Sequence, residues 1–113
     1  MKVRLTKIQM QNLMRWFDAM IQDMKSDLAE KGEITYFQGA KKELGLDGAI
    51  ALDGKLSLKR TAVLQISELE RTVLLDMMVN LMEIAEENRD GSLEADIHFW
   101  RMQDGVARLK AAA

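Results

Sequence analysis

Residues 73–85 have the sequence VLLDMMVNLMEIA and form the most continuously apolar part of the chain. Their Leu, Met, Val and Ile side chains cover most of the circumference of a helix rather than one stripe of it. A helix of this kind is buried on several sides. A chain of 113 residues offers few other helices to surround it, so the sequence predicts that a second subunit covers part of this surface.

The helical pattern on either side of this stretch is expected to run over residues 59–90, where Gly91 ends it. Ser92 is then placed to cap a last helix over residues 92–111. An apolar stripe with alternating three- and four-residue steps supports this last helix: Phe99, Met102, Val106, Leu109 and Ala113.

A further long helix is predicted before the apolar stretch, over residues 7–31. Thr6 and Gln9 have the spacing of a capping box, in which each side chain bonds the backbone N–H of the other residue. Gly32 supplies the left-handed residue that commonly ends a helix. The apolar stripe follows a heptad: Met10, Met14, Phe17, Ile21, Met24 and Leu28.

Residues 32–58 hold five of the seven glycines and interrupt the helical pattern. Residues 49–52 and 55–58 are expected to be two short strands around Asp53-Gly54, because Asp-Gly suits the tight turn of a β-hairpin. Residues 34–37 are β-prone and suit a third strand, and residues 40–44 fit one helical turn.

The sequence therefore predicts a mainly α fold. Its three principal helices span about 7–31, 59–90 and 92–111, and a glycine-rich β-hairpin insertion at 32–58 separates the first two. The length suits a single domain over residues 1–113.

Composition removes several classes of protein. The chain has no cysteine and one histidine, so disulfide scaffolds, thiolate zinc sites and cysteine nucleophiles are excluded. No apolar segment approaches the ~20 residues of a membrane span, and no signal peptide is recognised at the start. We therefore expect a cytoplasmic, non-enzymatic protein without a cofactor.

The leading hypothesis is a self-associating helical interaction protein: a scaffold, an adaptor or a chaperone-like subunit. It predicts a homodimer or a larger assembly, and a second protein as a possible further partner. Methionine-rich helices adapt to varied partner surfaces, and aromatic residues anchor interfaces. The expected contact residues lie on the first and middle helices: Met14, Trp16, Phe17, Ile21, Met77, Met78 and Leu81.

One alternative is a small dimeric nucleic-acid-binding regulator that uses the hairpin region. Residues 1–60 carry a net charge of +3 and residues 61–113 a net charge of −5, so any phosphate contacts belong to the first half. The basic candidates are Lys41, Lys42, Lys55, Lys59 and Arg60.

A second alternative is metal binding through the acidic cluster at residues 83–96. Glu86, Asn88 and Asp90 fit the first ligand positions of a calcium loop, but Ile97 stands where the closing bidentate Glu is needed. A helix end followed by a helix start explains the same sequence, so no metal ligand is assigned.

Overall fold

The computed structural model describes residues 1–57 and 62–113. The described elements follow in the order β1 (Lys2–Leu5), α1 (Lys7–Lys31), α2 (Ala40–Leu56), β2 (Ala62–Gln65), α3 (Glu68–Glu87) and α4 (Leu93–Lys110). The described chain is mainly helical with one small antiparallel sheet, which confirms the coarse expectation. It holds four helices where the sequence predicted three.

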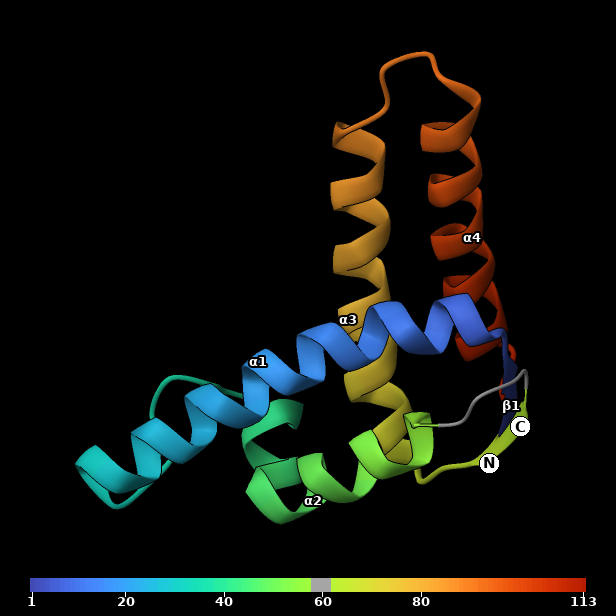
Figure 1. Ribbon diagram of the computed structural model, residues 1–113. Helices are drawn as coiled ribbons and strands as arrows, with labels where there is room; N and C mark the ends of the chain where they lie inside the picture. Colours follow the sequence, from blue (N-terminus) through green and yellow to red (C-terminus); the bar gives the residue numbers. More distant parts are fainter. Residues whose placement is uncertain (58–61) are drawn as a thin grey trace.

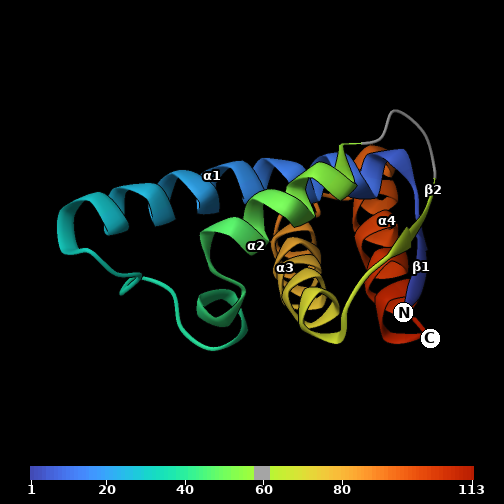
Figure 2. The same ribbon diagram turned by 90° about the horizontal axis from the view of Figure 1, so that it is seen from below.

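The helices form two pairs that meet at an angle. α3 and α4 stand side by side as a hairpin, and α1 crosses them so that the free end of the hairpin extends beyond it (Figure 1). Seen from below, α1 and α2 lie next to each other across the ends of α3 and α4 (Figure 2). The molecule is therefore L-shaped, with extents of 46 × 31 × 24 Å.

The prediction for α1 is confirmed at both ends. The N–H of Thr6 donates to Gln9 Oε1 at 2.9 Å, and the N–H of Gln9 donates to Thr6 Oγ1 at 3.2 Å. Gly32 adopts φ 73° and its N–H donates to the Leu28 carbonyl oxygen. The Gln9 side chain also donates to the Arg101 carbonyl oxygen and to Asp104, both at 2.9 Å, which fixes the start of α1 on α4.

The middle helix is shorter than predicted. α3 begins after Ser67, whose hydroxyl accepts from the N–H of Glu70 while the Glu70 carboxylate accepts from the N–H of Ser67. Residues 62–65 are a strand, and the predicted start at 59 lies outside the described residues. The last helix agrees with its prediction to within a residue, and the Ser92 hydroxyl caps it.

The β-hairpin predicted at 49–58 is wrong, because residues 49–56 belong to α2 and Asp53-Gly54 lies inside that helix. Leu58 lies outside the described residues. A hairpin would place Ile50 and Leu52 on one face, yet Ile50 is exposed and Leu52 is buried. Helical spacing decides the outcome, since the buried side chains of α2 are Ala49, Leu52 and Leu56.

The start of the insertion also departs from one expectation. Residues 34–37 form no strand, whereas residues 40–44 are helical, as the alternative interpretation held. A kink follows at Gly45, with φ 71° and ψ −179°, a conformation that glycine adopts without strain.

The small sheet joins segments far apart in the sequence. β1 and β2 pair antiparallel, with Lys2 opposite Gln65 and Leu5 opposite Ala62. Val3, Leu5 and Leu64 point into the core, as the two-residue period of a strand requires. The N–H of Lys2 donates to the Ala113 carbonyl oxygen at 2.9 Å, so both chain ends lie together beside the sheet (Figure 1).

A single hydrophobic core links all six described elements. Within it α4 packs closely on α3, where Gly105 lies against the buried side chain of Met78. No helix in residues 1–57 and 62–113 is long and apolar enough to cross a membrane.

Candidate interaction surfaces

Most of the residues predicted to contact a partner are buried inside the chain itself. Phe17 and Met78 have no exposed surface, and Met77 has 1%. Ile21 and Leu81 are also buried, while Met14 is half-buried and Trp16 is 37% exposed. The four helices of a single chain therefore already cover five of the seven, on the surface where a second subunit was expected.

Trp16 lines a surface groove between α1, the segment 32–39, the start of α2 and α3. We call it the aromatic groove. One of its hollows has a volume of about 220 Å³ and is bordered by Trp16, Ala19, Met20, Asp23, Tyr36, Phe37, Lys41 and Met77. The rings of Tyr36 and Phe37 meet edge to face with centroids 5.0 Å apart. Two further hollows of about 310 and 550 Å³ adjoin it on either side of Tyr36.

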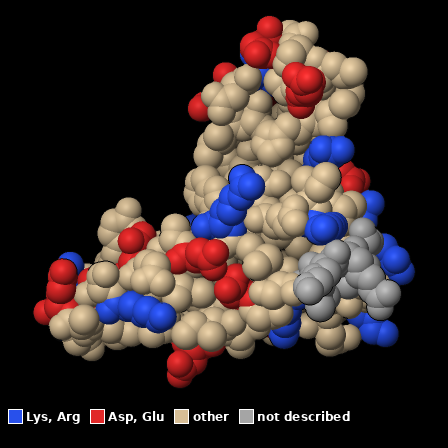
Figure 3. All heavy atoms as spheres, viewed as in Figure 1, with Lys and Arg blue, Asp and Glu red and all other residues tan. Residues whose placement is uncertain are grey.

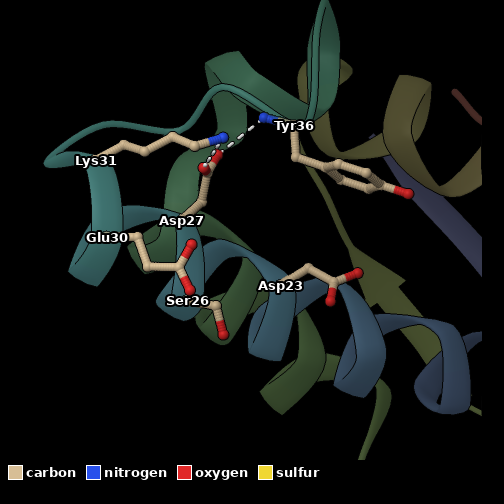
Figure 4. A pocket seen from close by; sticks show the side chains of 6 residues that line it. All are labelled: Asp23, Ser26, Asp27, Glu30, Lys31 and Tyr36. Atoms are coloured by element: carbon tan, nitrogen blue, oxygen red, sulfur yellow. Dashed lines mark hydrogen bonds and ion pairs between the residues drawn. The ribbon is translucent and has the colours of Figure 1, made fainter.

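The segment 32–39 is held in place by Asp27, which is buried near the end of α1. Its carboxylate accepts from the N–H and the hydroxyl of Thr35 and from the N–H of Tyr36. Lys31 forms an ion pair with it at 3.4 Å. The backbone hydrogen bonds from Thr35 and Tyr36 lower the pKa of Asp27 to about 2. This carboxylate therefore fixes the position of Tyr36 at the groove (Figure 4).

Two other carboxylates of α1 border the same groove. Figure 4 shows Asp23, Ser26 and Glu30 along α1 below the segment that carries Tyr36. Within the described part of the chain, neither Asp23 nor Glu30 takes part in an ion pair. The two lysines of the groove are paired, Lys31 with Asp27 and Lys41 with Asp76 at 3.2 Å. The groove thus combines aromatic faces with two uncompensated negative charges.

A second surface lies on α4. Leu93, Ile97 and Trp100 follow one another at steps of four and three residues, so they form a stripe on one helix face. Leu93 is 66% exposed and Trp100 is 50% exposed. Ile97 and Trp100 border a hollow of about 420 Å³ together with Ile8 of α1. We call these four residues the α4 stripe.

Charge is separated along the α3–α4 hairpin. Residues 83–96, at its free end, carry six carboxylates and one arginine, a net charge of −5. Residues 1–7 and 101–113, at its other end, carry six basic groups and one aspartate, a net charge of +5. Acidic side chains accordingly gather at the tip in Figure 3, and basic ones gather around the paired strands. The hairpin is therefore electrically polar from end to end.

The basic residues of the nucleic-acid alternative are not brought together as a free patch. Lys55 pairs with Glu70 at 2.8 Å and also donates to the Gln65 carbonyl oxygen. Lys41 pairs with Asp76, while Lys42 is exposed. Lys59 and Arg60 lie outside the described residues. The hairpin that was to present these side chains is the helix α2.

The acidic cluster at 83–96 is organised as a helix-to-helix connection. Asp90 accepts from the N–H of Ser92 at 2.9 Å, and the hydrogen bonds from Ser92 lower the pKa of Asp90. Arg89 pairs with Asp96 at 2.9 Å and lies 4.7 Å from the centre of the Phe99 ring. In the described residues, no three His, Asp or Glu side chains gather in a way that would hold a metal ion.

Sequence reasoning named Trp16 of the aromatic groove as a contact residue but missed Tyr36, Phe37 and the α4 stripe. The regular helical spacing of Leu93, Ile97 and Trp100 is visible in the sequence. The prediction for this helix instead follows the longer apolar stripe through Phe99 and Met102. Tyr36 and Phe37 were assigned to a possible strand, and no local pattern places them beside Trp16. Only the hydrogen bonds from the segment 32–39 to Asp27 bring them there.

Comparison with known proteins gives no relative: no family model, no curated protein and no solved structure matches this chain.

Proposed function

We propose that the protein is a non-enzymatic, self-associating helical interaction protein, an adaptor or scaffold, and that the α4 stripe is its self-association surface. The supporting observation is an exposed apolar stripe with complementary charges on either side of it. The proposed setting is cytoplasmic, because a chain without cysteine gains nothing from an oxidising compartment.

The charges suit a two-fold arrangement. Glu94 and Arg101 stand two helical turns apart on α4, with Ile97 between them. If two copies of α4 pack antiparallel about Ile97, Glu94 of one copy meets Arg101 of the partner subunit, and the reverse pair forms by symmetry. The same arrangement brings the acidic tip of each hairpin toward the basic end of the other, which favours encounter and fixes direction.

Apolar residues supply the affinity in this arrangement. Trp100 and Leu93 lose exposed surface to the partner subunit, and large aromatic anchors of this kind contribute about 2 kcal/mol or more when truncated. This surface does not include the buried residues of α1 and α3 that the sequence predicts as contacts, because those side chains are covered within a single chain.

The test is sedimentation of the full chain over a range of concentrations. We expect a species with twice the 12.9 kDa mass of one chain. Leu93→Ser with Trp100→Ser should weaken association by roughly 30-fold or more. Ile50→Ser, which removes an apolar residue on α2 that is 47% exposed, is the control and should leave association unchanged.

Charge exchange tests the antiparallel geometry separately. Glu94→Arg and Arg101→Glu should each weaken association, and the double exchange should restore it because both ion pairs re-form with reversed sign. A monomer at every concentration, or a dimer indifferent to the α4 stripe variants, contradicts the proposal.

A further inference from the structure

The aromatic groove has the chemistry of a site for an organic cation. Trp16, Tyr36 and Phe37 supply three aromatic rings from two separate segments. The faces of such rings attract guanidinium and ammonium groups, most strongly where water is partly excluded. Asp23 and Glu30 add two negative charges that no lysine or arginine among the described residues neutralises.

A metal ion does not fit the same residues. The described part of the chain gathers no three acidic or imidazole side chains that would hold one. Asp27, the third carboxylate of the groove, has its oxygens occupied by Thr35, Tyr36 and Lys31. What remains is two separate carboxylates beside apolar faces, which suits a cation that carries its own apolar stem and its own hydrogen-bond donors.

The shape of the groove favours a peptide over a small free cation. Tyr36 is 72% exposed, so a small ligand would stay in contact with water on one side. The three hollows share Tyr36 as a lining residue, so they lie next to one another on the surface. Side chains on one face of an extended peptide recur about every 7 Å, and Asp23 and Glu30 are about 10 Å apart along α1, so one segment can reach both.

We propose that the aromatic groove binds a basic peptide segment of a partner protein, with one arginine guanidinium on the faces of Trp16 and Tyr36 beside Asp23 and a second arginine beside Glu30. The ring faces select the flat guanidinium, and the carboxylates select its charge. This surface is separate from the α4 stripe, so the protein would hold a second copy on one face and a basic segment of another protein on the other.

The experiment measures binding of a labelled peptide, Gly-Arg-Ala-Arg-Ala-Arg-Gly, to the full chain at low salt. The comparison peptide carries citrulline, the uncharged analogue of arginine, at the same three positions. We expect the arginine peptide to bind at least about tenfold more tightly than the citrulline peptide. Trp100→Phe retains Trp16 as the only tryptophan, so a change in its fluorescence reports occupancy of the groove.

Variants at exposed positions test the assignment without unfolding the chain. Asp23→Asn with Glu30→Gln should weaken binding of the arginine peptide about tenfold, and Trp16→Leu should weaken it about threefold or more. The matched control, Asp47→Asn with Glu68→Gln, also removes two exposed charges, but at positions outside the groove, and should leave binding unchanged. Circular dichroism checks that each variant keeps its helix content.

Four results would overturn the proposal. These are no binding of the arginine peptide at millimolar concentration, equal binding of the citrulline peptide, and an equal loss in the control variant. The fourth is loss of self-association in Asp23→Asn with Glu30→Gln, which would mean that a second copy occupies the groove. Failure of the α4 stripe as a dimer surface leaves these expectations intact, because Leu93→Ser with Trp100→Ser should bind the arginine peptide as the unaltered chain does.

Discussion

The α3–α4 hairpin and the α1–α2 pair each consist of two neighbouring helices with buried apolar side chains, yet they differ in how closely they pack and in how they are joined. α3 and α4 approach so closely that a Cβ at position 105 would lie 2.7 Å from Met78 Cε. The α1–α2 pair is joined by the long connection 32–39, which a buried carboxylate fastens to α1. The close packing between α3 and α4 leaves no room for a ligand. The segment 32–39, which hydrogen bonds hold to α1, has hollows beside it. The α1–α2 pair therefore carries the more open surface.

The largest expected effect comes from a core residue of α1. Phe17 belongs to α1 but is fully buried in the common core. Phe17→Ala should lower the free energy of unfolding by about 3–5 kcal/mol, because it leaves a cavity in that core. Urea unfolding followed by circular dichroism measures this loss. Tyr36→Ser, at a highly exposed position, should change stability by less than ~0.5 kcal/mol.

Phe17→Ala also separates a core role from the contact role that the sequence predicted. If it left stability unchanged but reduced self-association, Phe17 would be an interface residue and the contrast between the two regions would fail.

An intermediate effect comes from the glycines of the two regions. Gly105→Val should destabilise the chain by about 1–3 kcal/mol, because the added atoms displace the buried Met78 side chain. Gly54→Ala in α2 should stabilise it by up to ~1 kcal/mol, since a Cβ there meets no atom within 4 Å and alanine favours the helix. Denaturation midpoints of the two variants should move in opposite directions. Midpoints that both fall would show that α2 is packed as tightly as the hairpin.

A last, pH-dependent effect concerns two aspartates, Asp27 near the end of α1 and Asp53 in α2. Hydrogen bonds lower the pKa of Asp27 to about 2 from 3.8, so its charged form stabilises the fold above pH 3.8, and that stabilisation is lost as the pH falls toward 2. Burial, followed by the nearby carboxylate of Asp18, raises the pKa of Asp53 above 3.8. Its charged form therefore destabilises the fold at neutral pH, and the penalty is relieved as the pH falls through the raised pKa.

Two conservative variants check these signs. At neutral pH, Asp27→Asn should be less stable than the unaltered chain and Asp53→Asn more stable. Both differences should shrink on acidification, that of Asp53→Asn over the pH range down to 3.8 and that of Asp27→Asn between 3.8 and 2. Unfolding curves at a series of pH values measure them. A stability difference of the same sign for both variants would contradict the opposite environments of the two carboxylates.

The sequence predicted correctly the helices whose ends carry recognisable capping residues. The capping box at Thr6 and Gln9 and the left-handed Gly32 located α1, and Ser92 located the start of α4. The equivalent box at Ser67 and Glu70 was overlooked, and the middle helix was therefore expected to begin too early. These features are readable because they involve hydrogen bonds between residues at most four apart.

The insertion was mispredicted because its glycines suggested turns. Asp53-Gly54 is compatible with a tight turn and with a helix, and the local sequence does not choose between them. The choice is made by Ala49, Leu52 and Leu56, which reach the core only if residues 49–56 are helical. The same applies to the groove, where Tyr36 lines the same hollow as Trp16 because Asp27 holds the segment 32–39 against α1.

The sequence by itself determined that the chain is mainly helical and where α1 and α4 begin and end. It also determined that residues 73–85 are apolar around most of the helix and not along one stripe only. The tertiary structure alone decided which of those surfaces stay exposed. It placed Phe17, Met77 and Met78 inside and left Trp100 outside, and it paired β1 with a strand some sixty residues away in the sequence. The physical reason is that periodicity and caps act within a few residues, whereas burial depends on which distant elements come together.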